Sequence, residues 1–185
     1  ETDAMIDLHS GGEDNIFPRH ECEIAQSCAG SGRPNFARLW FHTRHLIVEG
    51  EKMSKSKGNF FTVRDLLDKG ATPAAIRLEL IRTHYRVNAN FTLQGLRDCQ
   101  RQIDRWARAA AWLEQHREVP IDAPGPIRVA LDEFTRSLAD DLNVARAIGV
   151  LNEAIGSMSP DAAPVPGSGP LTIADELDAL RTMDS

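Results

Sequence analysis

The sequence is poor in cysteine, has no excess of positive charge and contains no long apolar run. Its three cysteines, Cys22, Cys28 and Cys99, form an odd set without Cys-x-x-Cys spacing, which favours reduced thiols over a disulfide framework. The net charge of -6 argues against a protein that coats nucleic acid by charge alone, because such domains are usually basic. No apolar run approaches the roughly 20 residues of a membrane span, and no charged-then-apolar leader is present, so we expect a cytoplasmic protein.

What the chain does contain is ordinary for a folded protein. Its 185 residues, 42% apolar and 26% charged, are enough for one good core or two small ones. Positive charge is nevertheless concentrated locally, in the segments Lys52–Arg64, Arg77–Arg86 and Arg97–Arg108, whereas acidic residues gather after Asp132. These basic segments leave room for local contacts with anions or nucleic acid.

The segment Gly50–Phe61 combines lysines, hydroxyl groups and flanking glycines. It lies between a β-prone run, Leu46–Val48, and a helix start at Thr62, so we expect a loop. Ammonium groups on long side chains can follow a phosphate as it moves, and serines add further donors. A polyphosphate site is one interpretation, and a solvated loop is the other. The lysines and serines concerned are Lys52, Ser54, Lys55, Ser56 and Lys57.

Before this segment the pattern predicts an α/β fragment. A strand at Met5–Leu8 is expected to leave its sheet into the loop His9–Gly12, where Gly11 and Gly12 would let a ligand approach the backbone and His9 and Asp14 would supply polar groups. A plain glycine turn is the alternative. The remaining expected elements are a helix from Pro18 to about Ala29, a strand over 36–43 and a hairpin over 45–53.

After Thr62 the pattern is helical. Thr62 and Thr72 are expected N-caps, and apolar residues spaced three and four apart predict a long helix over 92–116. A turn at Asn88–Asn90 precedes it, and a linker at Val119–Pro126 follows. Four further segments complete the prediction: two amphipathic helices over 127–138 and 143–155, a mobile stretch over 160–170 and a short helix over 173–180.

The residues Lys52–Ser56 read KMSKS, which resembles the motif of class I aminoacyl-tRNA synthetases. The surrounding segments are similar, in order and spacing, to those of cysteinyl-tRNA synthetases. The resemblance implies the second half of a Rossmann-like nucleotide-binding domain followed by an all-α region. It divides the chain into a catalytic part (1–61), a helical stem-contact region (62–118) and the start of a DALR-like helical domain (119–185). The segments are His9–Asp14, Ile16–Ser27, Gly58–Thr62, His84–Arg86 and Asp140–Asn143.

The resemblance implies a cysteine-tRNA ligase, which uses ATP with Mg²⁺ to activate cysteine and transfers it to tRNA. Lys55 and Lys52 would be the catalytic cations, because negative charge grows on the α-phosphate and the leaving pyrophosphate. Asp14 would bind the amino acid. The implied ATP-binding residues are Lys55, Lys52, Ser54, His9, Gly11 and Gly12, and the implied tRNA contacts are Arg97, Arg101 and Arg105.

The family also uses a zinc ion, held by two earlier cysteines and then a histidine and a glutamate four residues apart. Glu23 has the glutamate position, but Arg19 has the histidine position, and guanidinium cannot coordinate a metal. We therefore hypothesise that Arg19 replaces the ion as the partner of Glu23 and that no zinc binds there. A zinc ion held there by His20 or Cys22 as substitute ligands would refute this hypothesis. His20 faces about 100° from Arg19 on a regular helix, so recruiting His20 would require the helix to distort.

The family's His-x-Gly-His motif and its two zinc cysteines are not found in this sequence. We therefore expect the chain to be inactive alone, with its sheet edge covered by a missing amino-terminal half or by a second copy of the chain. One alternative is a noncatalytic module that binds tRNA through an arginine face, to which Arg108 would also belong. A degenerate gene remnant that folds poorly is the other.

Overall fold

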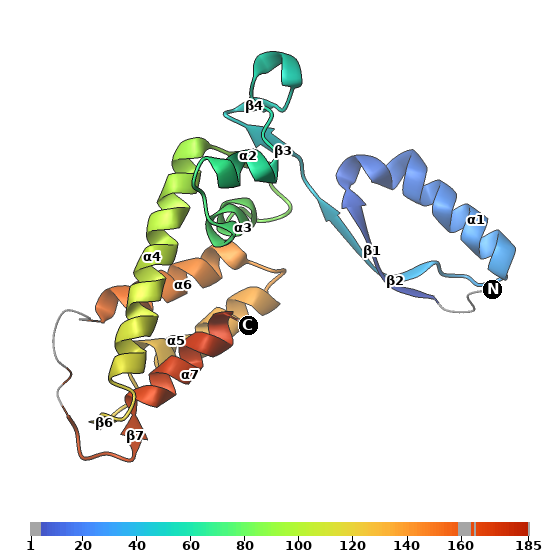
Figure 1. Cartoon of the computed structure of the whole chain (residues 1–185). Helices are drawn as coiled ribbons and strands as arrows, with labels where there is room; N and C mark the ends of the chain where they lie inside the picture. The colour runs from blue at the N-terminus through green and yellow to red at the C-terminus, as the bar shows by residue number, and fades with distance from the viewer. Residues whose placement is uncertain (1–4, 159–163, 165, 185) are drawn as a thin grey trace. The chain divides into compact units, whose positions relative to one another are not determined.

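The structure is a computed structural model that describes residues 5–158, 164 and 166–184 (Figure 1). The chain forms two compact units. The first comprises the residues up to Phe60 together with Tyr85–Phe91, and the second comprises Phe61–His84 together with the residues from Thr92 onward. The finer division at residues 61 and 118 into functional parts stays a prediction. Among the described residues, no helix is both long and apolar enough to cross a membrane.

The first unit begins with a parallel β-α-β arrangement. Strand β1 (Ile6–Gly12) pairs with β2 (Ala37–Thr43), and helix α1 (Glu21–Ser31) lies between them in sequence. The register runs from Ile6 opposite Ala37 to Gly12 opposite Thr43. The prediction of a loop over His9–Gly12 is therefore wrong, because parallel pairing with β2 keeps these glycine-containing residues extended.

The entry into α1 is irregular. A 3₁₀ turn, η1 (Glu13–Asn15), leads into an irregular segment, η2 (Ile16–His20), in which Phe17 has extended dihedral angles and forms a kink. The regular α-helix starts at Glu21, three residues after the predicted start at Pro18. Because the kink is at Phe17, the spacing of an α-helix does not relate the residues before Phe17 to those of α1.

A hairpin forms the other sheet of this unit, as predicted. Strands β3 (Leu46–Val48) and β4 (Glu51–Lys52) are antiparallel, and Glu49 and Gly50 between them both have positive φ, as a type I′ turn requires. Strand β5 (Ala89–Phe91) pairs in parallel with β3, so the predicted turn at Asn88–Asn90 is wrong. The side chains of Asn88 and Asn90 accept hydrogen bonds from the backbone of His45 and Gly50.

The second unit starts with helices whose N-caps follow the prediction. Thr62 and Asp65 form a capping box at α2 (Val63–Asp68), Thr72 caps α3 (Pro73–Ile81), and Thr92 caps α4 (Leu93–Gln115). A buried carboxylate joins α3 to α4. Glu79 forms an ion pair with Arg82 at 2.7 Å and accepts hydrogen bonds from the Thr92 amide at 3.3 Å and the Cys99 thiol at 3.3 Å.

The core of the second unit lies between α4 and three later helices: α5 (Pro126–Ala139), α6 (Val144–Ser157) and α7 (Ile173–Asp184). Helix α7 is four residues longer than predicted. The predicted linker contains a two-residue strand, β6 (Pro120–Ile121), which pairs with β7 (Leu171–Thr172). Of the predicted mobile stretch, residues 160–163 and 165 lie outside the described residues. Buried core residues include Ala109, Leu113, Ile127, Phe134, Ala147, Leu151, Ile155, Ile173 and Leu177.

Candidate functional site

The KMSKS loop is closed by one asparagine. The side chain of Asn59 accepts a hydrogen bond from the Ser54 amide at 2.8 Å through Oδ1. Its Nδ2 donates to the carbonyl oxygens of Val48 at 3.3 Å and Lys52 at 3.2 Å. Asn59 therefore ties the two ends of the loop to each other and to β3. The sequence marks Asn59 only as a member of the segment Gly58–Thr62.

The loop pairs one of its own lysines internally. Lys57 Nζ lies 2.7 Å from Glu51 Oε2, and the Ser54 and Ser56 hydroxyl oxygens are 2.8 Å apart. Lys52 is exposed at the end of β4. Lys55 begins a 3₁₀ turn, η3 (Lys55–Lys57), and its side chain lies outside what the structure describes. The predicted phosphate contacts of Lys52, Ser54 and Lys55 stay predictions.

The two glycines that end β1 lie against the chain's own side chains. A Cβ at Gly11 would come 3.0 Å from Asn15 Nδ2 and 3.0 Å from His20 Cε1, and a Cβ at Gly12 would overlap the Asp14 carboxylate. The close packing of the Asn15, His20 and Asp14 side chains against the end of β1 is therefore sufficient reason for glycine at both positions. Their predicted contact with ATP stays a prediction.

Ion pairs connect the turn η1, which follows β1, to the residues just before β3. Glu13 forms ion pairs with Arg44 at 2.6 Å and with His45 at 3.3 Å. Asp14, the predicted amino-acid ligand, is exposed, and its Oδ1 lies 4.0 Å from His45 Nε2. The sequence segment that carries the KMSKS loop is thereby connected to the end of β1 within one compact unit.

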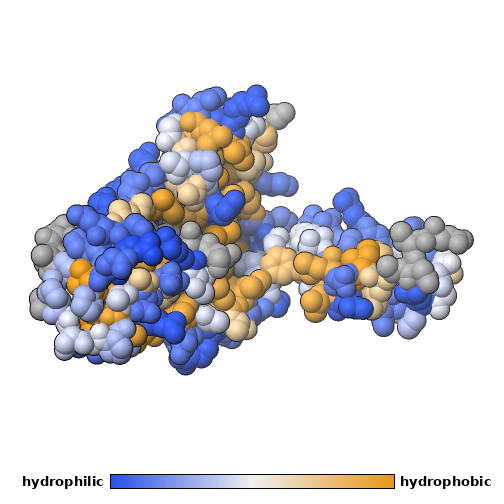
Figure 2. Space-filling view, turned by 60° about the horizontal axis from the view of Figure 1, so that its bottom comes forward, coloured by the Kyte–Doolittle hydropathy of each residue, from blue (hydrophilic) through white to orange (hydrophobic). Residues whose placement is uncertain are grey.

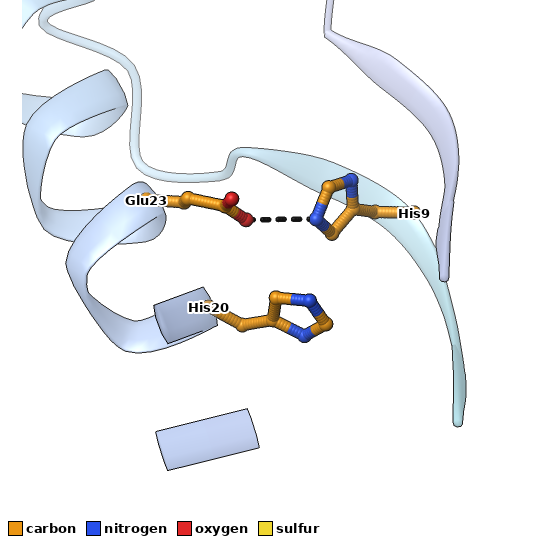
Figure 3. A group of neighbouring side chains, drawn as sticks. All are labelled: His9, His20 and Glu23. Carbon is orange, nitrogen blue, oxygen red and sulfur yellow. Dashed lines mark hydrogen bonds and ion pairs between the residues drawn. The ribbon is translucent and has the colours of Figure 1, made fainter. Parts of the chain in front are cut away.

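A cluster of histidines and one glutamate occupies the space between β1 and α1 (Figure 3). His9 Nε2 lies 2.8 Å from Glu23 Oε2, and the rings of His9 and His20 are 4.7 Å apart. His20 is only 5% exposed, and its Nδ1 lies 2.9 Å from His42 Nε2. Trp40 packs beside both His9 and His20, with ring centroids at 5.0 and 5.3 Å.

The structure gives Glu23 a different partner from the one we predicted. Its carboxylate pairs with His9, whereas Arg19 is exposed. Arg19 lies just before α1, in the segment η2, and the carboxylate of Glu23 is directed to the strand residue His9 instead. His20 also lies close to Glu23, because side chains three residues apart are neighbours on a helix, so the expected distortion of the helix is not needed.

The zinc ligand set implied by the resemblance does not fit these residues. Arg19 cannot coordinate a metal, and the carboxylate of Glu23 is engaged by His9. Within the described ranges, the one group of three or more potential ligands close enough to share an ion is His9, His20 and Glu23, which contains no cysteine. Cys22 is exposed and Cys28 half-buried, and neither belongs to the group.

The arginines predicted to contact tRNA are exposed along α4 in the second unit. Arg97 donates to Gln94 at 2.8 Å, Arg101 forms an ion pair with Asp98, and Arg105 donates to the Asn152 carbonyl oxygen at 3.5 Å. Asp98 and Asp104 on the same helix reduce the positive potential of this surface. Its role in tRNA binding stays a prediction.

Comparison with known proteins identifies the family. Residues 2–101, more than half of the chain, match the family model described as the catalytic domain of class I (C) tRNA synthetases. The chain belongs to this family. It is 46% identical over 151 residues to the cysteine-tRNA ligase of Brachyspira hyodysenteriae, covering 79% of this chain and 32% of that protein. It is 47% identical over 151 residues to that of Paracoccus denitrificans, covering 82% and 30%.

These matches confirm the resemblance to cysteinyl-tRNA synthetases. The chain spans about a third of the length of the curated relatives it matches. A solved structure of LeuRS from Agrobacterium radiobacter, in a ternary complex with tRNA and LeuAMS, aligns with a TM-score of 0.61 at 18% identity, covering 96% of this chain and 25% of that one. The shared fold confirms the predicted α/β part followed by helices in this class I synthetase chain.

Two members of the cluster, His20 and His42, are not among the predicted site residues. His42 lies two residues after Trp40 in β2, so both side chains share one face of the strand. That spacing was a usable signal, because the register places His9 opposite Trp40. His20 is the residue immediately before α1, and its burial is a property of the folded chain.

Proposed function

We propose that this chain is the part of a cysteine-tRNA ligase that holds the phosphates of ATP and Mg²⁺ while cysteine is activated in the cytoplasm. The observation that carries the proposal is the KMSKS loop, whose ends are tied together by Asn59. A loop fixed at its base but carrying long cationic side chains suits a leaving group that must be neutralised and then released. Family membership supports the same reaction class.

The proposed reaction begins with attack of the cysteine carboxylate on the α-phosphorus of ATP. The bond from that phosphorus to the bridging oxygen of the β-phosphate breaks, and pyrophosphate leaves with the electron pair. Lys55 and Lys52 stabilise the growing negative charge, and Ser54 supports the loop. His9, Gly11 and Gly12 contribute to the ATP site, and Asp14 receives the ammonium group of cysteine.

The acyl group then passes from the adenylate to the terminal ribose of tRNA, and AMP leaves. We assign the exposed α4 residues Arg97, Arg101 and Arg105 to contact with the tRNA backbone, since arginine binds phosphate through paired N–H donors. Their partial neutralisation by neighbouring aspartates implies a modest contribution to binding. Recognition of tRNA would therefore depend on other parts of the enzyme as well.

The β1–β2 sheet of the first unit has exposed apolar residues, which supports the presence of a further structural element that covers it. Parallel sheets are normally buried on both faces, yet Leu8 and Leu39 on β1 and β2 are 57% and 66% exposed. Figure 2 shows hydrophobic residues gathered over the part that contains these strands. We propose that another part of the catalytic domain covers this surface in the complete enzyme, with a second copy of this chain as the alternative.

Phosphate binding is tested by titrating the chain with MgATP and with pyrophosphate in a calorimeter. Lys55→Ala should weaken binding about 10–100-fold, the loss typical of a hydrogen bond to a charged group. Lys57→Ala is the matched control, because Lys57 is paired with Glu51 and should change affinity by about threefold or less. Equal affinity in the wild-type chain and Lys55→Ala would refute the assignment.

Activity is tested by ATP-pyrophosphate exchange. We expect none from the chain alone, because it spans about a third of the length of its relatives. Replacing the matching third of the Brachyspira hyodysenteriae ligase with this chain carrying Arg19→His should retain exchange. A folded chimera without exchange would contradict the proposed role in activation.

The second candidate function is a noncatalytic tRNA-binding module. The exposed arginines of α4 favour it, and the arginine at position 19 agrees with a lost catalytic site. It predicts salt-sensitive binding of tRNA by the isolated chain, abolished by combined charge reversal at Arg97, Arg101 and Arg105. Binding that persists after the reversal would refute this candidate.

A further inference from the structure

Strands β1 and β2 end side by side, and the chain diverges from that point into two arms. Their pairing stops at Gly12 and Thr43, after which β1 continues into η1 and β2 continues through Arg44-His45 into β3. Ligands of open α/β sheets bind outside such carboxyl ends of strands. Residues proposed above to act in the reaction lie on both arms, with Asp14 in η1 and the KMSKS loop beyond β3.

One carboxylate spans the two arms within the first unit. Glu13 Oε2 lies 2.6 Å from Arg44 Nη1, and Glu13 Oε1 lies 3.3 Å from His45 Nδ1. Each oxygen therefore has its own partner, which suits a carboxylate with two acceptor oxygens and does not suit an amide with only one. The other ring nitrogen of His45, Nε2, lies 4.0 Å from Asp14 Oδ1. Glu13 thus contacts the base of the β3–β4 hairpin directly and approaches Asp14 through His45.

The two residues that Glu13 holds are also fixed through their backbone. The Arg44 amide donates to the Tyr85 carbonyl oxygen at 2.8 Å, and the His45 amide donates to Asn88 Oδ1 at 3.2 Å. Arg44 and His45 are therefore the point at which the end of β1 and the segment of β5 are both attached to β3. A displacement there would move the strand that leads into the KMSKS loop.

We propose that Glu13 is a positioning residue for amino-acid activation, which keeps the KMSKS hairpin and Asp14 in a fixed relation through Arg44 and His45. The inference rests on the function proposed above. Catalysis by charged groups depends on their relative position, and a displacement of about 1 Å can cost roughly 100-fold in rate. The resemblance assigns no role to Glu13 or to Arg44.

The contact itself is tested by amide hydrogen exchange of the full chain, measured by mass spectrometry. Glu13→Gln keeps the shape of the side chain but removes the charge that holds Arg44. We expect exchange in the segment 44–59 to become about 3–10-fold faster, as for the loss of a partly exposed ion pair. Exchange in α1 and in the second unit should change by less than about twofold.

Asp7→Asn is the matched control. Asp7 forms an ion pair with Arg38 at 3.2 Å, which also joins β1 to β2 but lies near the opposite end of these strands. Its loss should leave exchange in the segment 44–59 within about twofold of wild type. Faster exchange in this segment in Asp7→Asn as in Glu13→Gln would overturn the proposal.

A double-mutant cycle tests whether Glu13 acts through Arg44. Arg44→Gln should accelerate exchange less than Glu13→Gln, because the contact between Glu13 and His45 remains. The double variant should match Glu13→Gln, because residues that act as a pair are not additive. Unchanged exchange in Glu13→Gln, or additive effects of the two single variants, would overturn the proposal.

The role in the reaction is tested by calorimetric titration with MgATP and with pyrophosphate. Removing a negative charge would by itself strengthen binding of these anions, so weaker binding reports lost positioning. Glu13→Gln should weaken both affinities about 3–10-fold, whereas Asp7→Asn, with the same change of charge, should not weaken them. The melting temperature should fall by no more than about 2–4 °C in either variant.

The two proposals can fail separately. Wild-type or higher affinity in Glu13→Gln would overturn the positioning role and leave the proposed function standing. Absence of binding by the wild-type chain would refute the proposed function and with it the role of Glu13 in activation. In that case the exchange rates would still show whether Glu13 holds the hairpin.

Discussion

The two compact units differ in how they bury their side chains. Nearly all fully buried apolar residues named above belong to the second unit, where four helices enclose a shared core. In the first unit, Val48 and Phe91 are buried, but Ile6, Leu8 and Leu39 are exposed. The second unit therefore has a core of its own, whereas the first combines a polar cluster with apolar surface, as expected of a part that is completed by another element.

The largest expected difference between the two units is in the reactivity of their cysteine thiols. Burial, together with the hydrogen bond to Glu79, raises the pKa of the Cys99 thiol to about 12. Its thiolate fraction at pH 8 is then roughly 1,000-fold below that of an ordinary thiol. We expect a disulfide reagent to modify exposed Cys22 quickly and Cys99 only upon unfolding. Mass spectrometry of the labelled chain would check this, and equal rates would show that α3 and α4 open readily.

Truncation of the second unit's core should cost the next largest amount. Ile127 has no exposed surface, so Ile127→Ala should lower the free energy of unfolding by about 2–5 kcal/mol. Urea denaturation followed by the fluorescence of Trp106 and Trp112, in a Trp40→Phe background, would isolate this unit. A loss below about 1 kcal/mol would mean that the helices can repack around the cavity.

Loss of a helix cap should have a smaller effect. The Thr92 hydroxyl accepts a hydrogen bond from the Gly95 amide at 2.8 Å at the start of α4. Thr92→Ala should therefore destabilise the second unit by about 1 kcal/mol. Thr92→Ser, which keeps the hydroxyl, is the matched control. Equal destabilisation by both variants would show that the threonine methyl group, and not the cap, is responsible.

The smallest effect is expected on the apolar surface of the first unit. Leu39→Ala should change the free energy of unfolding of the isolated chain by no more than about 0.5 kcal/mol, because the side chain is 66% exposed. Chemical denaturation followed by Trp40 fluorescence, in a background that carries Trp106→Phe and Trp112→Phe, would measure it. A loss above about 2 kcal/mol would show that Leu39 is already covered, for example by a second copy, and would make the stability depend on protein concentration.

The sequence predicted the second unit better than the first for a physical reason. The N-caps Thr62, Thr72 and Thr92 and the spacing of apolar residues in α4 are local signals, and a helix depends largely on such signals. Strand β5, three residues long, depends on pairing with β3 some 40 residues earlier, which no local pattern reveals. The start of α1 was misplaced because an irregular turn precedes it.

The sequence by itself determined the family, through the KMSKS residues and their neighbours, and the positions of the capped helices. Only the tertiary structure decided that Glu23 pairs with His9, that His20 is buried beside them and that Asn59 closes the loop. Motifs and helix caps are set by residues a few positions apart, whereas these contacts depend on where strands and irregular turns bring distant side chains together.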